Sequence, residues 1–120
     1  MNAEQILHFL RAADGSVPRL NNHLSFIMGY TRVPNTDPAI KKRATWFDPQ
    51  GNVVTLIPDF TGSIDAARMF LEAVVQPKAA GFAQRSDGTF AQIDGYPPVK
   101  GATPALALCM AAIEATLAKA

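Results

Sequence analysis

The residues best suited to chemistry are a run of cations beside large aromatic side chains. Lys41, Lys42 and Arg43 are followed closely by Trp46 and Phe47. A cation can bind a phosphate and an aromatic ring can stack on a base, so this cluster suits an anionic ligand with a flat part. A structural interpretation competes with it, because basic runs in loops are usually solvated and alternate residues of a strand point to opposite faces.

Two expected helix starts offer backbone donors for the same kind of ligand. Gly62 permits close approach to the backbone, Ser63 stands at one helix start, and Thr103 precedes Pro104 at another. The first N–H groups of a helix lack partners within the helix and attract anions. Every helix has such an end, however, and most of them bind only water or a capping side chain.

A second loop has the composition of a binding loop. Tyr96 and Lys100 flank two prolines, which would keep the loop ordered before a ligand binds and place both side chains near the start of the last helix. With Arg85 as a further cation, the predicted ligand-binding residues are Arg43, Trp46, Gly62, Ser63, Arg85, Tyr96, Lys100 and Thr103.

The other residues with chemical potential favour structural roles. His8 and His23 fall on different expected helices, and Cys109 is the only cysteine and lies on an apolar helical stripe. The sequence contains neither a Gly-x-Ser-x-Gly elbow nor a Gly-rich phosphate loop. We therefore predict no enzyme activity, no metal site and no cofactor. The aspartates at turns and helix starts are explained by local hydrogen bonding; they are Asp48, Asp59, Asp65, Asp87 and Asp94.

Composition narrows the class of protein further. The chain has 120 residues, of which 48% are hydrophobic and 18% charged, which suits one domain over residues 1–120. Eleven basic and ten acidic residues leave a net charge of +1, too little to hold a nucleic acid polymer. The apolar stretches are shorter than a membrane span and the first residues lack a basic leader, so we expect a soluble intracellular protein.

The elements that position these residues follow from periodicity and turn signals. Helices are expected at about 3–13, 17–28 with Ser16 as N-cap, 64–75 with Ser63 as N-cap, and from Thr103-Pro104 onward. Strands are expected at 44–47, 53–57, 79–85 and 89–94, with loops at 31–38 and 95–101. This order predicts an α+β fold, a three-layer α-β-α sandwich with about four strands in one mainly antiparallel sheet.

Two stretches carry a resemblance to a known family. The run LIPDFTGSIDAA from Leu56 to Ala67 and the run ATPALALCMAA from Ala102 to Ala112 resemble the phage ABA sandwich domain, and residues 18–118 can be laid along it. The resemblance implies an α-β-α sandwich encoded by a bacteriophage or prophage, and hence a location in the cytoplasm of the infected bacterial host. It implies no reaction and no set of functional residues.

These observations favour a non-enzymatic phage protein that sequesters a small anionic nucleotide-type ligand, such as a signal of bacterial defence, in a pocket between subunits. We expect a homo-oligomer. With this hydrophobic content and an Ala-rich last helix, the chain has more apolar surface than three thin layers can easily bury. The alternative is an accessory protein that acts structurally or by protein interaction, with the last helix as its docking surface. A third hypothesis, a small enzyme acting on nucleotides, lacks an identified acid or base.

Overall fold

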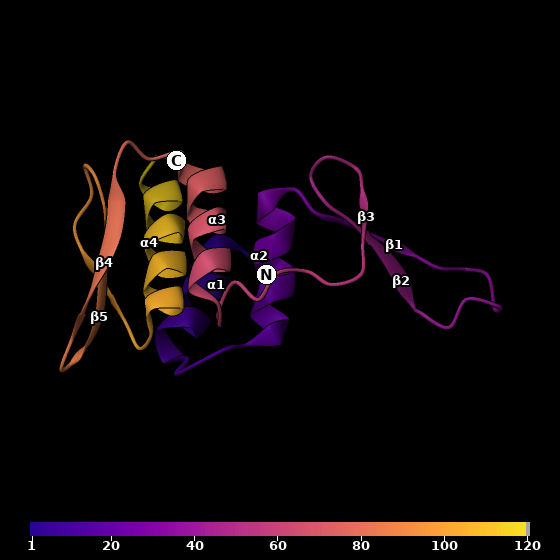
Figure 1. Ribbon diagram of the computed structural model, residues 1–120, viewed down its shortest axis with the longest axis horizontal. Coiled ribbons are helices and arrows are strands. Elements are labelled where there is room, and N and C mark those ends of the chain that lie inside the picture. Colours follow the sequence, from indigo (N-terminus) through magenta and orange to yellow (C-terminus); the bar gives the residue numbers. More distant parts are fainter. Residues whose placement is uncertain (120) are drawn as a thin grey trace.

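The computed structural model describes residues 1–119, so Ala120, the last residue of the predicted domain, lies outside the described part. Four helices and six strands occur in these residues (Figure 1). The elements are α1 (Ala3–Ala12), α2 (Pro18–Met28), β1 (Thr31–Pro34), β2 (Ala44–Phe47), β3 (Val53–Val54), α3 (Ile64–Val75), β4 (Ala80–Arg85), β5 (Gly88–Ile93), β6 (Val99–Gly101) and α4 (Pro104–Lys119).

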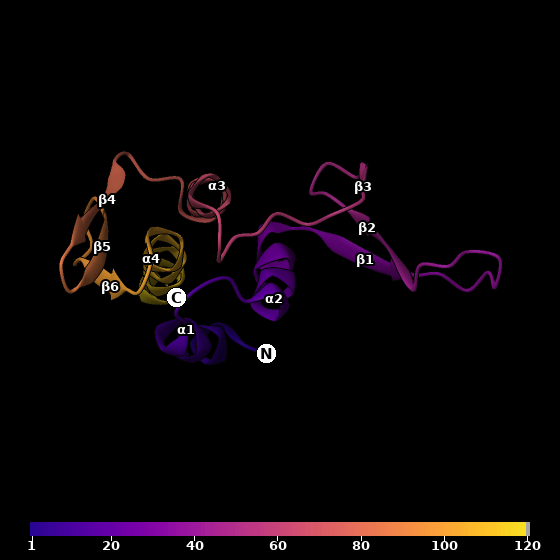
Figure 2. The same cartoon turned by 60° about the horizontal axis from the view of Figure 1, so that its bottom comes forward.

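Helix α4 is the centre of the fold. It packs against α3 and α1 on its sides and against the sheet β4-β5-β6, and Figure 2 shows it enclosed by these elements. Every residue from Ala105 to Ile113 is buried. Small residues permit the close approach: a side chain at Gly101 would collide with the Ala107 backbone. The Ala-rich last helix is therefore part of the buried core. The expectation that it forms an external docking surface is wrong.

Local signals explain the helix boundaries. Asn2 and Gln5 form a capping box at the start of α1, and Ser63 caps α3, with its side chain accepting from the Ala66 N–H at 3.2 Å. Helix α2 differs from the prediction, because its N-cap is Val17 and the cap makes no side-chain hydrogen bond. The Ser16 hydroxyl instead donates to the Asp59 carboxylate at 2.8 Å, which is a tertiary contact.

The sheet β4-β5-β6 is antiparallel and covers one side of α4. Thr89, Ala91 and Ile93 alternate along β5 and are buried, whereas the residues between them are more exposed. The segment 95–101 was expected to be an irregular loop, but its last three residues form strand β6 and pair with β5. The outer face of this sheet carries no helix, as Figure 1 shows.

The other antiparallel sheet, β1-β2-β3, projects from the helices as an arm. We define the arm as residues 31–57; it forms one end of a molecule measuring 51 × 26 × 23 Å (Figure 1). All four residues of β1 are exposed and those of β2 are half-buried. The segment 31–38 was expected to be a loop, yet its first four residues pair with β2 as an edge strand.

The predicted α+β class with antiparallel strands is confirmed. The strands form two sheets of three where about four in one sheet were expected. The reason is that α2 and α3 lie between the arm and the sheet β4-β5-β6, as Figure 2 shows. No helix among residues 1–119 combines the length and apolar character needed to cross a membrane.

Candidate functional site

Strand register in the arm places a cation beside the indole ring. Arg32 of β1 lies opposite Trp46 of β2, and Trp46 lies opposite Val54 of β3. Directly opposed residues of antiparallel strands project from the same face of the sheet. Arg32, Trp46 and Val54 therefore form one row across this face.

A hydrogen-bonded clamp positions two more cations at the same place. The Asn35 side-chain amide donates to the Lys42 carbonyl at 3.0 Å and accepts from the Thr45 hydroxyl at 2.9 Å. The Asn35 backbone N–H donates to the Arg43 carbonyl at 2.9 Å. These bonds hold both ends of the β1–β2 loop together and keep Lys42 and Arg43 next to β1.

The result is a basic groove, which we call the arm groove. It has a volume of about 370 Å³, within the range of small-ligand sites. Arg32, Lys42, Arg43 and Trp46 line it together with uncharged residues of β2 and β3 and the residue that follows β3, and no carboxylate is among the lining residues. Within residues 1–119, none of these three cations forms an ion pair.

The acidic side chains of the arm accept hydrogen bonds within turns. The Asp48 carboxylate accepts from the backbone N–H groups of Gln50 and Asn52, and that of Asp37 accepts from the N–H of Ala39. These contacts confirm the structural role expected for Asp48 at the hairpin. The positive charge of the arm groove is thus left available for an anion from outside.

Trp46 is supported from behind by a helix. Its ring lies 5.3 Å from the ring of Phe26 of α2, with 33° between the planes. Trp46 is half-buried, so part of the indole stays exposed at the arm groove. This is the arrangement needed to stack a flat group while the adjacent cations bind its charge.

Arg85 and Lys100 come together elsewhere, at the β4–β5 turn. Both contact Asp87, at 3.8 and 3.7 Å, and the Arg85 guanidinium lies 5.0 Å from the centre of the Phe90 ring. The turn belongs to the sheet at the opposite end of the molecule from the arm (Figure 1). These cations therefore do not join Arg43 and Trp46, and the Asp87 carboxylate between them offsets part of their charge.

The helix start at Gly62 and Ser63 is occupied by the protein itself. Ser63 caps α3, and a side chain at Gly62 would collide with the Asp59 carboxylate and with Ser16. Asp59 is held there by donation from Ser16 and, at 2.8 Å, from the Asn21 amide. A carboxylate of the chain thus takes the space that the sequence suggested for an external anion.

Tyr96 and Thr103 lie at different parts of α4. The Thr103 hydroxyl accepts from the Leu106 N–H at 3.2 Å and caps the helix start. Tyr96 is half-buried beside Ala115 and Ala118 in the second half of α4, where it borders a hollow of about 220 Å³. The loop that holds Tyr96 does not close over the start of α4, because the chain reverses before β6 and Tyr96 packs on the far end of the helix.

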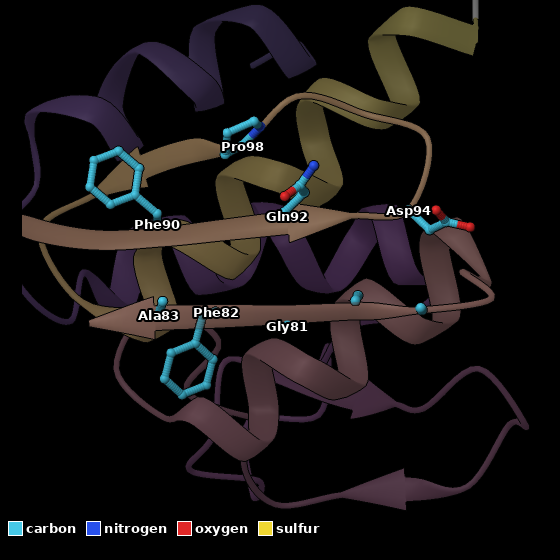
Figure 3. Close-up of a pocket in the computed structure, with 9 residues that line it drawn as sticks. Gly81, Phe82, Ala83, Phe90, Gln92, Asp94 and Pro98 are labelled. Carbon is cyan, nitrogen blue, oxygen red and sulfur yellow. The ribbon is translucent and has the colours of Figure 1, made fainter. Parts of the chain in front are cut away.

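A larger hollow, of about 540 Å³, lies on the strands β4 and β5 (Figure 3). Phe82, Phe90, Gln92 and Pro98 contribute to its lining, and its ionisable residue is Asp94. A carboxylate repels an anionic ligand, so this hollow is less suited to one than the arm groove. Among residues 1–119, no group of three metal-ligating side chains comes together.

The predicted site residues thus divide into five places, and of them only Arg43 and Trp46 share the arm groove. Arg32 is the residue that the sequence analysis missed. The prolines at positions 34 and 38 led to the prediction of a loop at 31–38. The β-branched residues on either side of Arg32, followed by Pro34, were a signal for an edge strand that ends at this proline. Comparison of the chain with protein-family models, with curated proteins and with solved structures finds no match.

Proposed function

We propose that this protein is a non-enzymatic binder of a small anionic nucleotide-type ligand, and that the arm groove is its binding site. One observation carries the proposal: three cations without ion pairs and the edge of an indole ring line one groove that contains no carboxylate. Arg32, Lys42 and Arg43 would bind phosphate oxygens, and Trp46 would stack on the base.

The biological form of the proposal rests on the resemblance to the phage ABA sandwich domain. A phage-encoded protein that sequesters a nucleotide signal of bacterial defence needs affinity and no catalysis. It would act in the cytoplasm of the infected host. The arm groove suits such a role, because its donors are long cationic side chains that bind phosphate oxygens directly.

The experiment exploits the single tryptophan of the chain, Trp46. Its fluorescence is titrated with ADP-ribose, with cyclic dinucleotides and with inorganic phosphate. We expect saturable quenching by at least one nucleotide. A charge-assisted contact contributes about 1.5–3 kcal/mol, so Arg32→Ala and Arg43→Ala should each weaken binding roughly 10- to 150-fold.

The matched control is Arg68→Ala, which removes an exposed cation of α3 that lies outside the arm groove. This variant should bind like the parent, and all three variants should melt at the parent temperature because the altered side chains are exposed. Parent-like binding by both arm variants would remove the arm groove from the proposal. Absence of binding by the parent would favour the second candidate function.

That second candidate is a protein-interaction or structural accessory without a ligand. It is favoured by the distribution of exposed large hydrophobic side chains, because six of the eleven such residues lie between positions 26 and 56. They are Phe26, Ile27, Val33, Ile40, Val53 and Leu56. The last four belong to the arm and the first two to the end of α2 that leads into it, and such a concentration of exposed apolar side chains is typical of an interaction surface.

A further inference from the structure

Strand β4 has an unprotected edge. It pairs with β5 on one side only, and all six of its residues are exposed. Natural sheets usually protect such edges with proline, charge or a bulge. From Ala80 to Gln84 the strand has no proline and no charged residue, so its free N–H and C=O groups are open to pairing with another strand.

A groove with an apolar floor and charged margins runs beside this edge, between β4 and α3. It has a volume of about 520 Å³; Leu71 of α3, Leu108 of α4 and Phe82 of β4 form an apolar part of its lining, and the charged residues Arg68, Glu72 and Lys78 also line it. Phe82 is 41% exposed and projects from β4 on the side away from β5 (Figure 3). A strand added to β4 would place alternate side chains over this groove.

The arm contains a candidate segment for that position, although the strand expected at 53–57 is shorter in the structure: β3 covers Val53–Val54, and the chain bends at Thr55 and Leu56, which would have to straighten to pair. Strand β3 pairs only with β2, so its outer edge is also free, whereas the opposite edge of the arm, β1, ends in Pro34. The segment from Val53 to Ile57 is uncharged, and its Leu56 is 83% exposed. This leucine is the most exposed large hydrophobic residue among those described.

The geometry makes the pairing intermolecular. The arm and β4 lie towards opposite ends of the long axis, with α2 and α3 between them (Figures 1 and 2). Strand β3 therefore cannot reach β4 of its own chain. Two copies placed antiparallel about a two-fold axis bring each arm to the β4 edge of the other, and such an isologous arrangement closes at two copies.

Charge favours the arm over a second β4 as the occupant of the edge. Lys78 precedes β4, and Arg85, which contacts Asp87, ends it, so antiparallel pairing of two β4 strands centred on Phe82 would bring Lys78 of each copy next to the Arg85–Asp87 pair of the other and would gain no net attraction. The segment 53–57 brings no charge. The arm as a whole has four basic and two acidic residues, whereas the rest of the chain has seven basic and eight acidic residues.

We propose that two copies of this chain exchange arms. The segment Val53–Ile57 of each copy pairs with β4 of the other, and Leu56 enters the groove formed by Leu71, Phe82 and Leu108. The two three-stranded sheets then continue across the interface. This inference is independent of whether the arm groove binds a nucleotide.

Disulfide trapping tests the proposed contact. In the double variant Leu56→Cys/Phe82→Cys, mild oxidation should give a covalent dimer on a non-reducing gel, while either single variant should remain a single chain. The native Cys109 is buried and does not interfere. Dimers from Phe82→Cys alone would indicate pairing of two β4 strands and dimers from Leu56→Cys alone pairing of two arms; either result, or no dimer from the double variant, overturns the proposal.

Light scattering provides a second test. The parent should have twice the mass of one chain at 100 µM, a concentration set by the roughly micromolar affinity expected of a small interface. Leu56→Asp should have the mass of one chain. Its melting curve should match that of the parent measured at a concentration low enough for the parent to be monomeric. The matched control Ile40→Asp alters another arm residue, 48% exposed, outside the segment; it should stay dimeric. A monomeric parent, or equal dissociation by both variants, contradicts arm exchange.

Discussion

At the residue scale, Cys109 shows how burial removes reactivity from a nucleophile. Its thiol is fully buried and donates to the Phe60 carbonyl at 3.2 Å. Burial, with a smaller effect of the Asp59 charge, raises the pKa of the thiol to about 12. The thiolate is the reactive form, so the buried position of Cys109 opposes the formation of a nucleophile there.

We expect the Cys109 thiol to resist iodoacetamide at pH 8 in the folded protein and to react rapidly in denaturant. The thiol ionises near its ordinary pKa of 9.0 when unfolded but near 12 when folded, so unfolding releases a proton between these values. The free energy of unfolding should therefore fall as pH rises from about 9 to 12. Urea titrations of the parent and of Cys109→Ala should show a shallower fall in the variant; equal slopes would contradict the shifted pKa.

At the element scale, a buried polar network joins α2 to the start of α3. Asn21 is buried; its side-chain oxygen accepts from both the backbone N–H and the hydroxyl of Thr61 at 2.9 Å, and its amide donates to Asp59. The Thr61 hydroxyl also accepts from the Val17 N–H at 2.8 Å. This network explains why Asp59, Thr61 and Gly62 serve as a joint between helices and not as a ligand site.

Asn21→Ala should lower the free energy of unfolding by about 2–4 kcal/mol, because it leaves buried donors of Thr61 without their acceptor. Urea denaturation followed by circular dichroism measures the loss. The control is Asn22→Ala, which alters the exposed neighbour on the same helix and should change stability by less than about 0.5 kcal/mol. Equal effects of the two variants would mean that helix propensity, and not the network, determines the result.

At the scale of the whole molecule, the arm gives the chain an elongated shape. The radius of gyration is 15.1 Å, against about 13.6 Å for a compact domain of this length. The arm has no core of its own, since β1 is exposed and the loop that follows it is exposed as well, apart from the half-buried Asn35. Such a segment depends on contacts at its base, on a bound ligand or on a partner for its order.

Limited digestion with trypsin should therefore cut first after Lys41, Lys42 or Arg43, because these residues lie in an exposed loop at the arm. Mass spectrometry of the early fragments identifies the cut. A nucleotide bound in the arm groove should slow this cut several-fold while leaving cuts in the body unchanged. A first cut after Arg68 or Arg85, which lie in regular elements of the body, would mean that the arm is the better protected part.

The sequence by itself determined the elements whose ends depend on neighbours in the chain. Helix α3 begins and ends where its apolar spacing and Ser63 predicted, and α1, α2 and the hairpin β4–β5 lie within one or two residues of expectation. Capping and turn formation join groups three or four residues apart, so they can be read from local residue types. The α+β class followed from the order of these elements.

Only the tertiary structure decided which residues meet. Arg32 faces Trp46 because β1 pairs with β2 in one register, and the space beside Gly62 is filled by the Asp59 carboxylate because Ser16, just before α2, and Asn21, within it, bind the carboxylate there. Helix α4 became the core because elements distant in sequence pack on all its sides. These outcomes depend on long-range packing and strand register. The energies of such contacts are summed over the whole fold, so they produce no local pattern in the sequence from which they could be predicted.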